Sequence, residues 1–247
     1  MNKLTIIMPT YNEEHHIFAN IEKTTKILNT FDFDYKIIIV DDGSKDNTFE
    51  EIKKSENISN KVHVMKTSIH KGKGHALKYG FQFAKSDLIM FLDADLDLPP
   101  EQINYFLETM KKTKSDIVIG SKRFFKSNYY YPTTRKILAI IYRLMVHTLF
   151  DLSVVDTQTG IKLFKNDVLK NTLPKVFVNG YAFDLDLLVN AHKLGYKIVE
   201  IPVILDFQKD SFLKKKKLLD MYKMFTDMLG IFYRIHIQQY LLFSKIK

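Results

Sequence analysis

Short runs of consecutive apolar residues, separated by stretches with helical periodicity, constrain the fold of this chain more than any other feature. The runs are LTIIM (4–8), KIIIV (36–40), VHVMK (62–66), LIMFL (88–92) and DIVIG (116–120). Helical patterns fill the intervals, at 14–30, 46–55, 74–85 and 100–112. Strands that are apolar at nearly every position are buried on both faces, as in a parallel sheet covered by helices. The alternation therefore predicts an α/β fold of the Rossmann-like type, with a mostly parallel sheet flanked by helices.

The pattern changes after about residue 125. An amphipathic helix is predicted at 133–150 and another helix at 181–194, with strands in DTQTGIKLF and in KIVEIPVILDF (197–207). The tail, 211–246, reads as a basic, aromatic helix. The predicted organisation is one catalytic domain, 1–210, followed by a basic amphipathic region, 211–247.

Polar residues follow the predicted strands where an open parallel sheet binds its ligands, at the carboxyl ends. The first strand is followed by PTYNEE, the second by DDGS, the fourth by DADLD and the fifth by SKR. Because carboxylates follow several strands at once, we expect them to meet at one edge of the sheet.

The DADLD segment is the strongest candidate site. On an extended backbone, residues two apart point the same way, so Asp93, Asp95 and Asp97 can present oxygen ligands to Mg²⁺ or Mn²⁺. The alternative is a solvated acidic loop that caps the 100–112 helix. The neighbouring acidic strand ends favour the metal site.

Two further segments fit a nucleotide. Asp41 and Asp42 can accept hydrogen bonds from a ribose hydroxyl or a base N–H, although DDGS is also a good turn and helix start. HKGKGHA (70–76), with Lys73, is similar to a phosphate cradle at a helix N-terminus. It lacks the P-loop spacing, and a flexible basic turn is the alternative.

Charged residues later in the chain are candidates for the second substrate. Arg123 and Arg135 flank an aromatic loop and suit bidentate phosphate contacts, against the alternative of solvated charges. Asp184 and Asp186 lie near the start of a predicted helix. They either contact sugar hydroxyls or the basic residues that bind the acceptor phosphate, or they only stabilise the helix dipole. Asp156 carries the same ambiguity.

The net charge of +9 calls for an anionic partner. Eight Lys and Arg against two Asp place +6 of that charge in the last 37 residues. A helix with lysines beside Leu, Phe, Tyr and Met is typical of the interface of an anionic membrane, and a core or oligomer helix is the alternative. The 247 residues hold no cysteine, which excludes thiolate metal sites and a cysteine nucleophile. No run reaches 18 uninterrupted apolar residues, so the expected location is cytoplasmic and peripheral on a membrane surface.

Taken in order, IIMPTYNEE, IIIVDDGSKDNT, HKGKGHALKYG and IMFLDADLDLPPE resemble the family 2 glycosyltransferases of the GT-A fold. GSKRF, VDTQTGIKLF and YAFDLDLL narrow the resemblance to the transferases that make dolichyl-phosphate mannose and dolichyl-phosphate glucose. It covers about residues 3–207.

The resemblance implies a role for each matching residue. Pro9, Tyr11, Glu13 and Asp42 would hold the base and ribose of the donor, and Asp93 and Asp95 would bind the divalent metal. Asp97 stands where mannose synthases carry a glutamine ligand, and Arg123 and Arg135 would grip the lipid phosphate.

The family pattern is not complete. His70 replaces a common Asn, Asp186 replaces a common Glu, and the Q-x-x-R-W motif of processive synthases is missing.

The resulting prediction is a hexosyltransferase that moves a sugar, with inversion, from a nucleoside diphosphate sugar to a polyprenyl monophosphate. UDP-glucose is favoured over GDP-mannose as donor. A soluble transferase acting on a glycan hydroxyl is the alternative, with Asp184 or Asp186 as its base. A nucleic-acid-binding protein would explain the charge but not the acidic strand ends, so no nucleic-acid partner is expected. No pattern predicts the oligomeric state.

Overall fold

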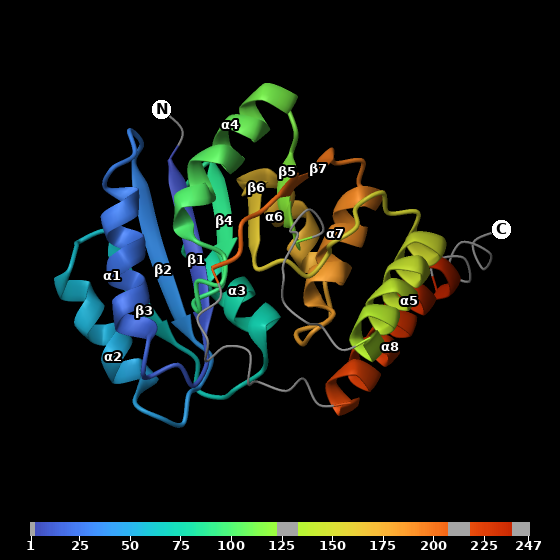
Figure 1. Ribbon diagram of the computed structural model, residues 1–247, viewed down its shortest axis with the longest axis horizontal. Helices are drawn as coiled ribbons and strands as arrows, with labels where there is room; N and C mark the ends of the chain where they lie inside the picture. The colour runs from blue at the N-terminus through green and yellow to red at the C-terminus, as the bar shows by residue number, and fades with distance from the viewer. Residues whose placement is uncertain (1–2, 123–132, 207–217, 239–247) are drawn as a thin grey trace.

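The computed structural model describes residues 3–122, 133–206 and 218–238, with the side chains of 133–139, 218–222 and 238 left out. Its centre is a seven-stranded sheet in the order β3-β2-β1-β4-β6-β5-β7 (Figure 1). The strands are β1 (Leu4–Thr10), β2 (Tyr35–Asp41), β3 (Val62–Lys66), β4 (Leu88–Leu92), β5 (Ile117–Ser121), β6 (Ile161–Lys165) and β7 (Ile198–Pro202). All neighbouring pairs are parallel except those of β6, which runs antiparallel to β4 and β5. The predicted mixed α/β fold with a mostly parallel sheet is confirmed.

Helices cover both faces of the sheet. They are α1 (Ile17–Leu28), α2 (Thr48–Lys54), α3 (Lys73–Phe81), α4 (Ile103–Thr113), α5 (Thr133–Phe150), α6 (Asn166–Thr172), α7 (Phe183–Lys193) and α8 (Leu218–Phe232). One core packs α1, α2 and α4 against the sheet, and the other packs α3, α5, α6, α7 and α8 against the opposite face. In β1, Ile6 and Met8 enter the first core and Ile7 the second, which is why the middle of this strand is apolar at consecutive positions.

The sequence placed most elements within a few residues of their observed bounds. The prediction at 133–150 matches α5, and the long run at 197–207 narrows to β7. The tail is helical as far as it is described, with α8 followed by a π-helical segment, Tyr233–Gln238. The short helix α6 was not predicted, because seven residues give too little periodicity to recognise.

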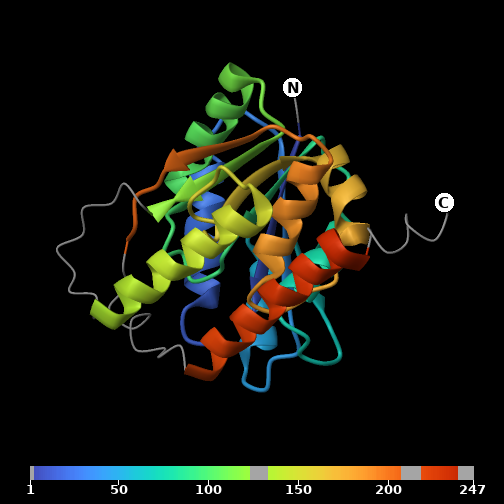
Figure 2. The same ribbon diagram turned by 90° about the vertical axis from the view of Figure 1, so that its right-hand side faces the viewer.

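The tail helix α8 packs against α5 and α7. Figures 1 and 2 show α5 and α8 lying side by side, and the rings of Phe150 and Phe232 meet at 6.3 Å between centroids. Met228, Ile231 and Ile235 are buried in the same core as α7. Residue 210 lies outside the described residues, and the division of the chain there stays a prediction.

The topology also decides where a ligand can approach. β1 lies between β2, the next strand in sequence, and β4, which comes three strands after β1. At such a switch point the loops leaving the carboxyl ends of neighbouring strands diverge to opposite faces and leave a crevice. The segments after β1, β2 and β4 therefore border one site.

Candidate active site

The loop after β4 carries three acidic side chains in a tight arrangement. The N–H of Asp93 donates to the carbonyl of Gly160 at 3.1 Å, and the N–H of Asp97 donates to Oδ1 of Asp95 at 3.2 Å. Leu96 between them has φ +52°, a left-handed conformation that costs free energy in a residue with a Cβ. Gly160 is required by close approach, because an added Cβ would overlap the carboxylate of Asp93.

The loop after β4 places several carboxylates close to one another. Burial, together with the neighbouring carboxylates of Asp93 and Asp97 and a smaller contribution from Glu13, raises the pKa of Asp95 to about 7. The loop thus holds more negative charge than its surroundings neutralise, which suits a bound cation.

Beside the loop runs an alternating chain of cations and anions. The ammonium of Lys73 lies 2.6 Å from Oδ1 of Asp93 and 3.7 Å from Oδ2 of Asp184. Asp184 also accepts from the ammonium of Lys162, at 2.8 Å. Burial alone would lower the pKa of Lys73, but the carboxylates of Asp184 and Asp93 outweigh burial and raise it. For Asp184, burial favours protonation, but Lys162 and Lys73 outweigh it and lower the pKa.

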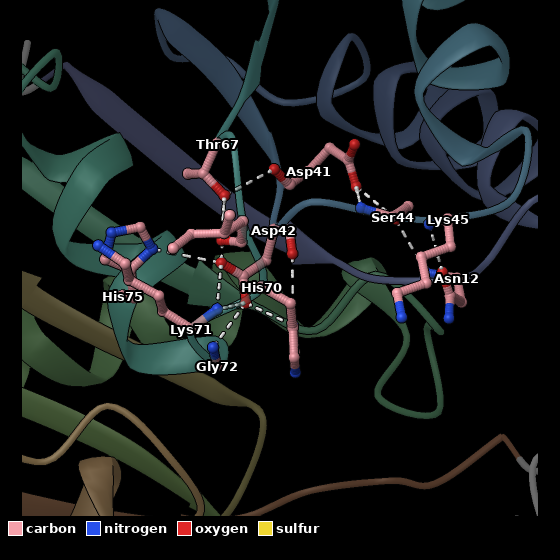
Figure 3. A network of polar contacts seen from close by, with 11 residues as sticks. Asn12, Asp41, Asp42, Ser44, Lys45, Thr67, His70, Lys71, Gly72 and His75 are labelled. Atoms are coloured by element: carbon pink, nitrogen blue, oxygen red, sulfur yellow. Dashed lines mark hydrogen bonds and ion pairs between the residues drawn. The ribbon is translucent and has the colours of Figure 1, made fainter.

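Asp42, at the end of β2, organises the basic turn (Figure 3). Its Oδ2 accepts from the backbone N–H of Gly72 at 2.6 Å and of Lys71 at 3.2 Å. Nδ1 of His70 lies 2.8 Å from the same oxygen, and Nδ1 of His75 lies 3.3 Å from Oδ1. Gly72 has φ +102°, and a Cβ there would come within 2.6 Å of the Asn179 carbonyl, so glycine is needed on both counts.

Asp41 differs from its neighbour because one of its oxygens is not engaged. Oδ1 accepts from the N–H and the hydroxyl of Ser44. Oδ2 is buried and finds no hydrogen-bond partner among the described residues, with the Lys66 ammonium 3.8 Å away. The hydroxyl of Thr10, which pairs in register with Asp41, is likewise buried without a described partner. Buried polar atoms of this kind are normally satisfied, so a ligand with a donor group would fit here.

The segment after β1 adds an aromatic surface. Pro9 lies in β1 opposite Val40, and the rings of Tyr11 and His70 stack at 3.8 Å between centroids with 23° between their planes. The N–H of Glu13 donates to the Thr48 hydroxyl at 2.7 Å. The structure therefore brings candidates from the ends of β1, β2 and β4 together with Lys73, as predicted from the parallel sheet.

The candidates for the second substrate are placed less completely. Arg123 lies outside the described residues, and Arg135 is in the first turn of α5 with its side chain outside them. Asp156 holds a loop, accepting from the N–H of Lys122 at 3.1 Å. Asp186 is fully buried and accepts from the N–H groups of Phe177 and Val178 at 2.9 and 3.2 Å.

Two important basic residues were not among the sequence candidates. Lys162 is a charged residue in the middle of the apolar strand GIKLF, which was a usable signal for a buried ion pair. Arg234 forms an ion pair with Asp186 and lies 4.7 Å from the Phe177 ring. It is separated from Asp186 by 48 residues, so no local pattern could connect them.

By themselves, the described side chains provide only part of a binding site for a divalent cation. Across residues 3–122, 133–206 and 218–238, no three His, Asp or Glu side chains come together closely enough to hold a metal ion. Mg²⁺ commonly takes one or two carboxylates and completes its shell with substrate phosphates and water. The uncompensated charge around Asp95 fits that arrangement.

A sheet with its switch point bordered by carboxylates, a lysine and an aromatic pair has the construction of an α/β enzyme that binds a nucleotide. The chain belongs to glycosyl transferase family 2, which matches residues 5–173. It is a glycosyltransferase, and the predicted family is confirmed.

Curated relatives narrow the resemblance. The dolichyl-phosphate beta-glucosyltransferase ALG5A of Trichomonas vaginalis is 32% identical, over 94% of this chain and 74% of its own length. The dolichyl-phosphate beta-glucosyltransferase of Dictyostelium discoideum is 30% identical, over 81% of this chain and 65% of its own length.

Solved structures show the same fold. Glucosyl-3-phosphoglycerate synthase of Mycobacterium tuberculosis, in complex with Mn²⁺, UDP and phosphoglyceric acid, superposes with a TM-score of 0.67 at 18% identity, covering 94% of this chain and 78% of that one. Mannosyl-3-phosphoglycerate synthase of Rubrobacter xylanophilus gives 0.69 at 17% identity, covering 96% and 75%. These glycosyltransferases confirm the GT-A fold.

Proposed function

We propose that this protein transfers glucose from UDP-glucose to a polyprenyl monophosphate such as dolichyl phosphate. The observation that carries the proposal is the carboxylate and lysine cluster at the sheet edge, in a chain about 30% identical to dolichyl-phosphate beta-glucosyltransferases. UDP-glucose carries an α linkage and those relatives are named for a β product, so a single displacement with inversion is proposed.

The uridine would lie at the ends of β1 and β2. The buried Oδ2 of Asp41 is an acceptor for an imino N–H of the base, and the Tyr11–His70 stack offers an aromatic surface nearby. Pro9, Glu13 and Asp42 would shape the same pocket. Asp42 would contribute mainly by holding the Lys71–Gly72 turn, since its oxygens already accept from that backbone.

The diphosphate would lie between Lys73 and the β4 loop. Asp93 and Asp95 would hold Mg²⁺ or Mn²⁺ there, with Asp97 as a further ligand. Bound in this position, the ion would stabilise the charge that develops on the leaving diphosphate. Lys73, at the N-terminus of α3, would add a second positive charge on the same group.

The acceptor needs little help to attack. A phosphate monoester is mostly dianionic at neutral pH, so no base must remove a proton from it. Arg123 and Arg135, on either side of the segment between β5 and α5, would position it and offset its repulsion from the donor.

The surroundings of Asp184 support a phosphate acceptor over a glycan hydroxyl, which would need a base. The carboxylate of Asp184 is held between two ammonium groups, and its lowered pKa makes it a weak base. Asp186 is buried and engaged by backbone N–H groups and Arg234. Asp184 would therefore act by placing Lys73.

The surface of α5 and α8 would lie on the membrane that holds the lipid. Exposed apolar side chains gather on both helices: Ile140, Ile141 and Leu144 on α5, and Leu229 on α8 with Tyr233 and Ile237 just after it. Among the described residues, no helix has both the length and the apolar character to cross a bilayer. The lysines at 214–217 lie outside the described residues and are proposed to meet anionic head groups.

The test is transfer of radiolabelled sugar to dolichyl phosphate with Mn²⁺ or Mg²⁺, comparing UDP-glucose, UDP-GlcNAc and GDP-mannose. We expect lipid-extractable product from UDP-glucose, abolished by EDTA and by Asp95→Ala. Asp87→Ala, an exposed acidic residue just before β4 at the opposite end of that strand, is the matched control and should retain activity. Hydrolysis of UDP-glucose without lipid product would overturn the acceptor, and product from GDP-mannose alone would overturn the donor.

A further inference from the structure

Lys73 occupies the position of a counter-ion on the proposed metal ligands. Its ammonium lies 2.6 Å from Asp93 and 3.7 Å from Asp184, and about a third of each of the Lys73 and Asp93 side chains, 30% and 33%, is exposed. Among the described residues, Lys73 is the only ion-pair partner of Asp93. This lysine therefore neutralises the carboxylate that a metal ion would need.

Asp184 does not depend on Lys73 in the same way. Lys162, whose side chain is 1% exposed, lies 2.8 Å from Asp184 and gives it a second cationic partner. Lys162 also donates to the carbonyl of Thr159, which fixes its position. When Lys73 moves away, Asp184 therefore keeps a buried cationic partner.

Lys73 is also placed so that it can move. It is the first residue of the nine-residue helix α3 and follows Gly72. Its ammonium sits on a flexible four-carbon stem with three rotatable donors. Helix N-termini favour anions, so an arriving diphosphate would find the same ammonium and the backbone N–H groups of α3 close together.

We propose that Lys73 stands in for the metal on Asp93 and is exchanged onto the donor diphosphate when metal and donor arrive together. The inference rests on the proposed nucleotide-sugar donor. The charges balance: a divalent cation adds two positive charges, and the diphosphate of a nucleotide sugar adds two negative charges. A metal ion alone would meet the Lys73 ammonium, and a diphosphate alone would meet the acidic loop, so each ligand binds weakly without the other. Lys73 is thus the residue that couples their binding.

The test is Mn²⁺ binding, measured by electron paramagnetic resonance with and without UDP, in the whole protein and in Lys73→Met. In the native protein we expect UDP to tighten Mn²⁺ binding by about 5–150-fold, the usual range of coupling between sites. Mn²⁺ should tighten UDP binding by the same factor in calorimetry, because linkage is reciprocal. In Lys73→Met, Mn²⁺ should bind more tightly than in the native protein when UDP is absent, and the coupling factor should shrink severalfold.

Two further variants serve as controls, one at another lysine and one that conserves the charge of Lys73. Lys85→Met removes an exposed lysine four residues after the end of α3 and leaves Lys73 on Asp93, so the coupling factor should keep its native value. Lys73→Arg keeps the charge and should keep most of the coupling. This variant tests the inference independently of whether Lys73→Met folds. Native coupling in a folded Lys73→Met, loss of coupling in Lys73→Arg, or no UDP dependence in the native protein would overturn the inference. Failure of lipid transfer with intact coupling would instead count against the acceptor alone.

Discussion

The ammonium of Lys162 lies 2.8 Å from the carboxylate of Asp184, and both side chains are shielded from water, at 1% and 8% exposure. Lys162 comes from β6, the only antiparallel strand among those described, and Asp184 from the first turn of α7. The pair joins the sheet to the helix behind the proposed diphosphate site. It leaves Asp184 a fixed anion against which Lys73 is placed.

Lys162→Met should destabilise the protein by up to about 3–5 kcal/mol, because the buried Asp184 keeps only the more distant Lys73 ammonium, 3.7 Å away, as a cationic partner. The free energy of unfolding in urea measures this. Adding Asp184→Asn to Lys162→Met should recover part of the loss. Lys165→Met, at an exposed pair with Asp116, should cost at most about 1 kcal/mol. A double variant less stable than Lys162→Met would contradict the charge argument.

Gly160→Ala should displace the Asp93 carboxylate, because the new methyl group would occupy its position. We expect Mn²⁺ affinity in the presence of UDP to fall by about 10–100-fold, as when the support of a metal ligand is removed. Gly230→Ala in α8 meets nothing within 4 Å and serves as control, with native affinity and slightly higher stability. Unchanged Mn²⁺ affinity in Gly160→Ala would show that Asp93 is not a ligand.

The pKa of Asp95 near 7 predicts a pH dependence of stability in the metal-free protein. The folded state keeps the proton to a higher pH than the unfolded chain, where the ordinary pKa is 3.8. The free energy of unfolding should therefore fall as the pH rises from about 4 to about 7, by a few kcal/mol at most.

Asp95→Asn removes this titration. In EDTA, it should flatten the decline and be the more stable protein at pH 8, as measured by urea unfolding across pH. Asn in place of exposed Asp87 should leave the decline unchanged. Parallel pH profiles for native protein and Asp95→Asn would refute the assignment.

Arg234→Ala should loosen the attachment of α8, because Asp186 is buried and loses its cationic partner. A cost of about 1–3 kcal/mol is expected for a buried acceptor left partly unsatisfied. Hydrogen exchange should accelerate in the amides of α8 more than in those of β1. Lys223→Ala, exposed on the same helix, should leave both rates unchanged. Uniform acceleration in sheet and helix would mean that α8 does not open separately.

The strands and the acidic edge could be predicted because both follow from local pattern. An apolar run ending in Asp93 or Asp41 defines a buried strand and its polar end, and parallel strands bring such ends together. The partners of these groups could not be predicted in the same way. Lys162, Arg234 and Gly160 are distant in sequence from the carboxylates they touch, and no periodicity links them.

The sequence by itself determined the α/β class, the positions of most strands and the gathering of Asp41, Asp93, Asp95 and Lys73 at one edge, because burial and strand direction are written in consecutive residues. Only the tertiary structure decided how charge is distributed there. It joined Asp42 to the Lys71–Gly72 turn, left an oxygen of Asp41 without a described partner, and set Lys73 between Asp93 and Asp184. Those outcomes depend on distances between side chains from different elements, and electrostatic interactions change steeply with such distances and with burial.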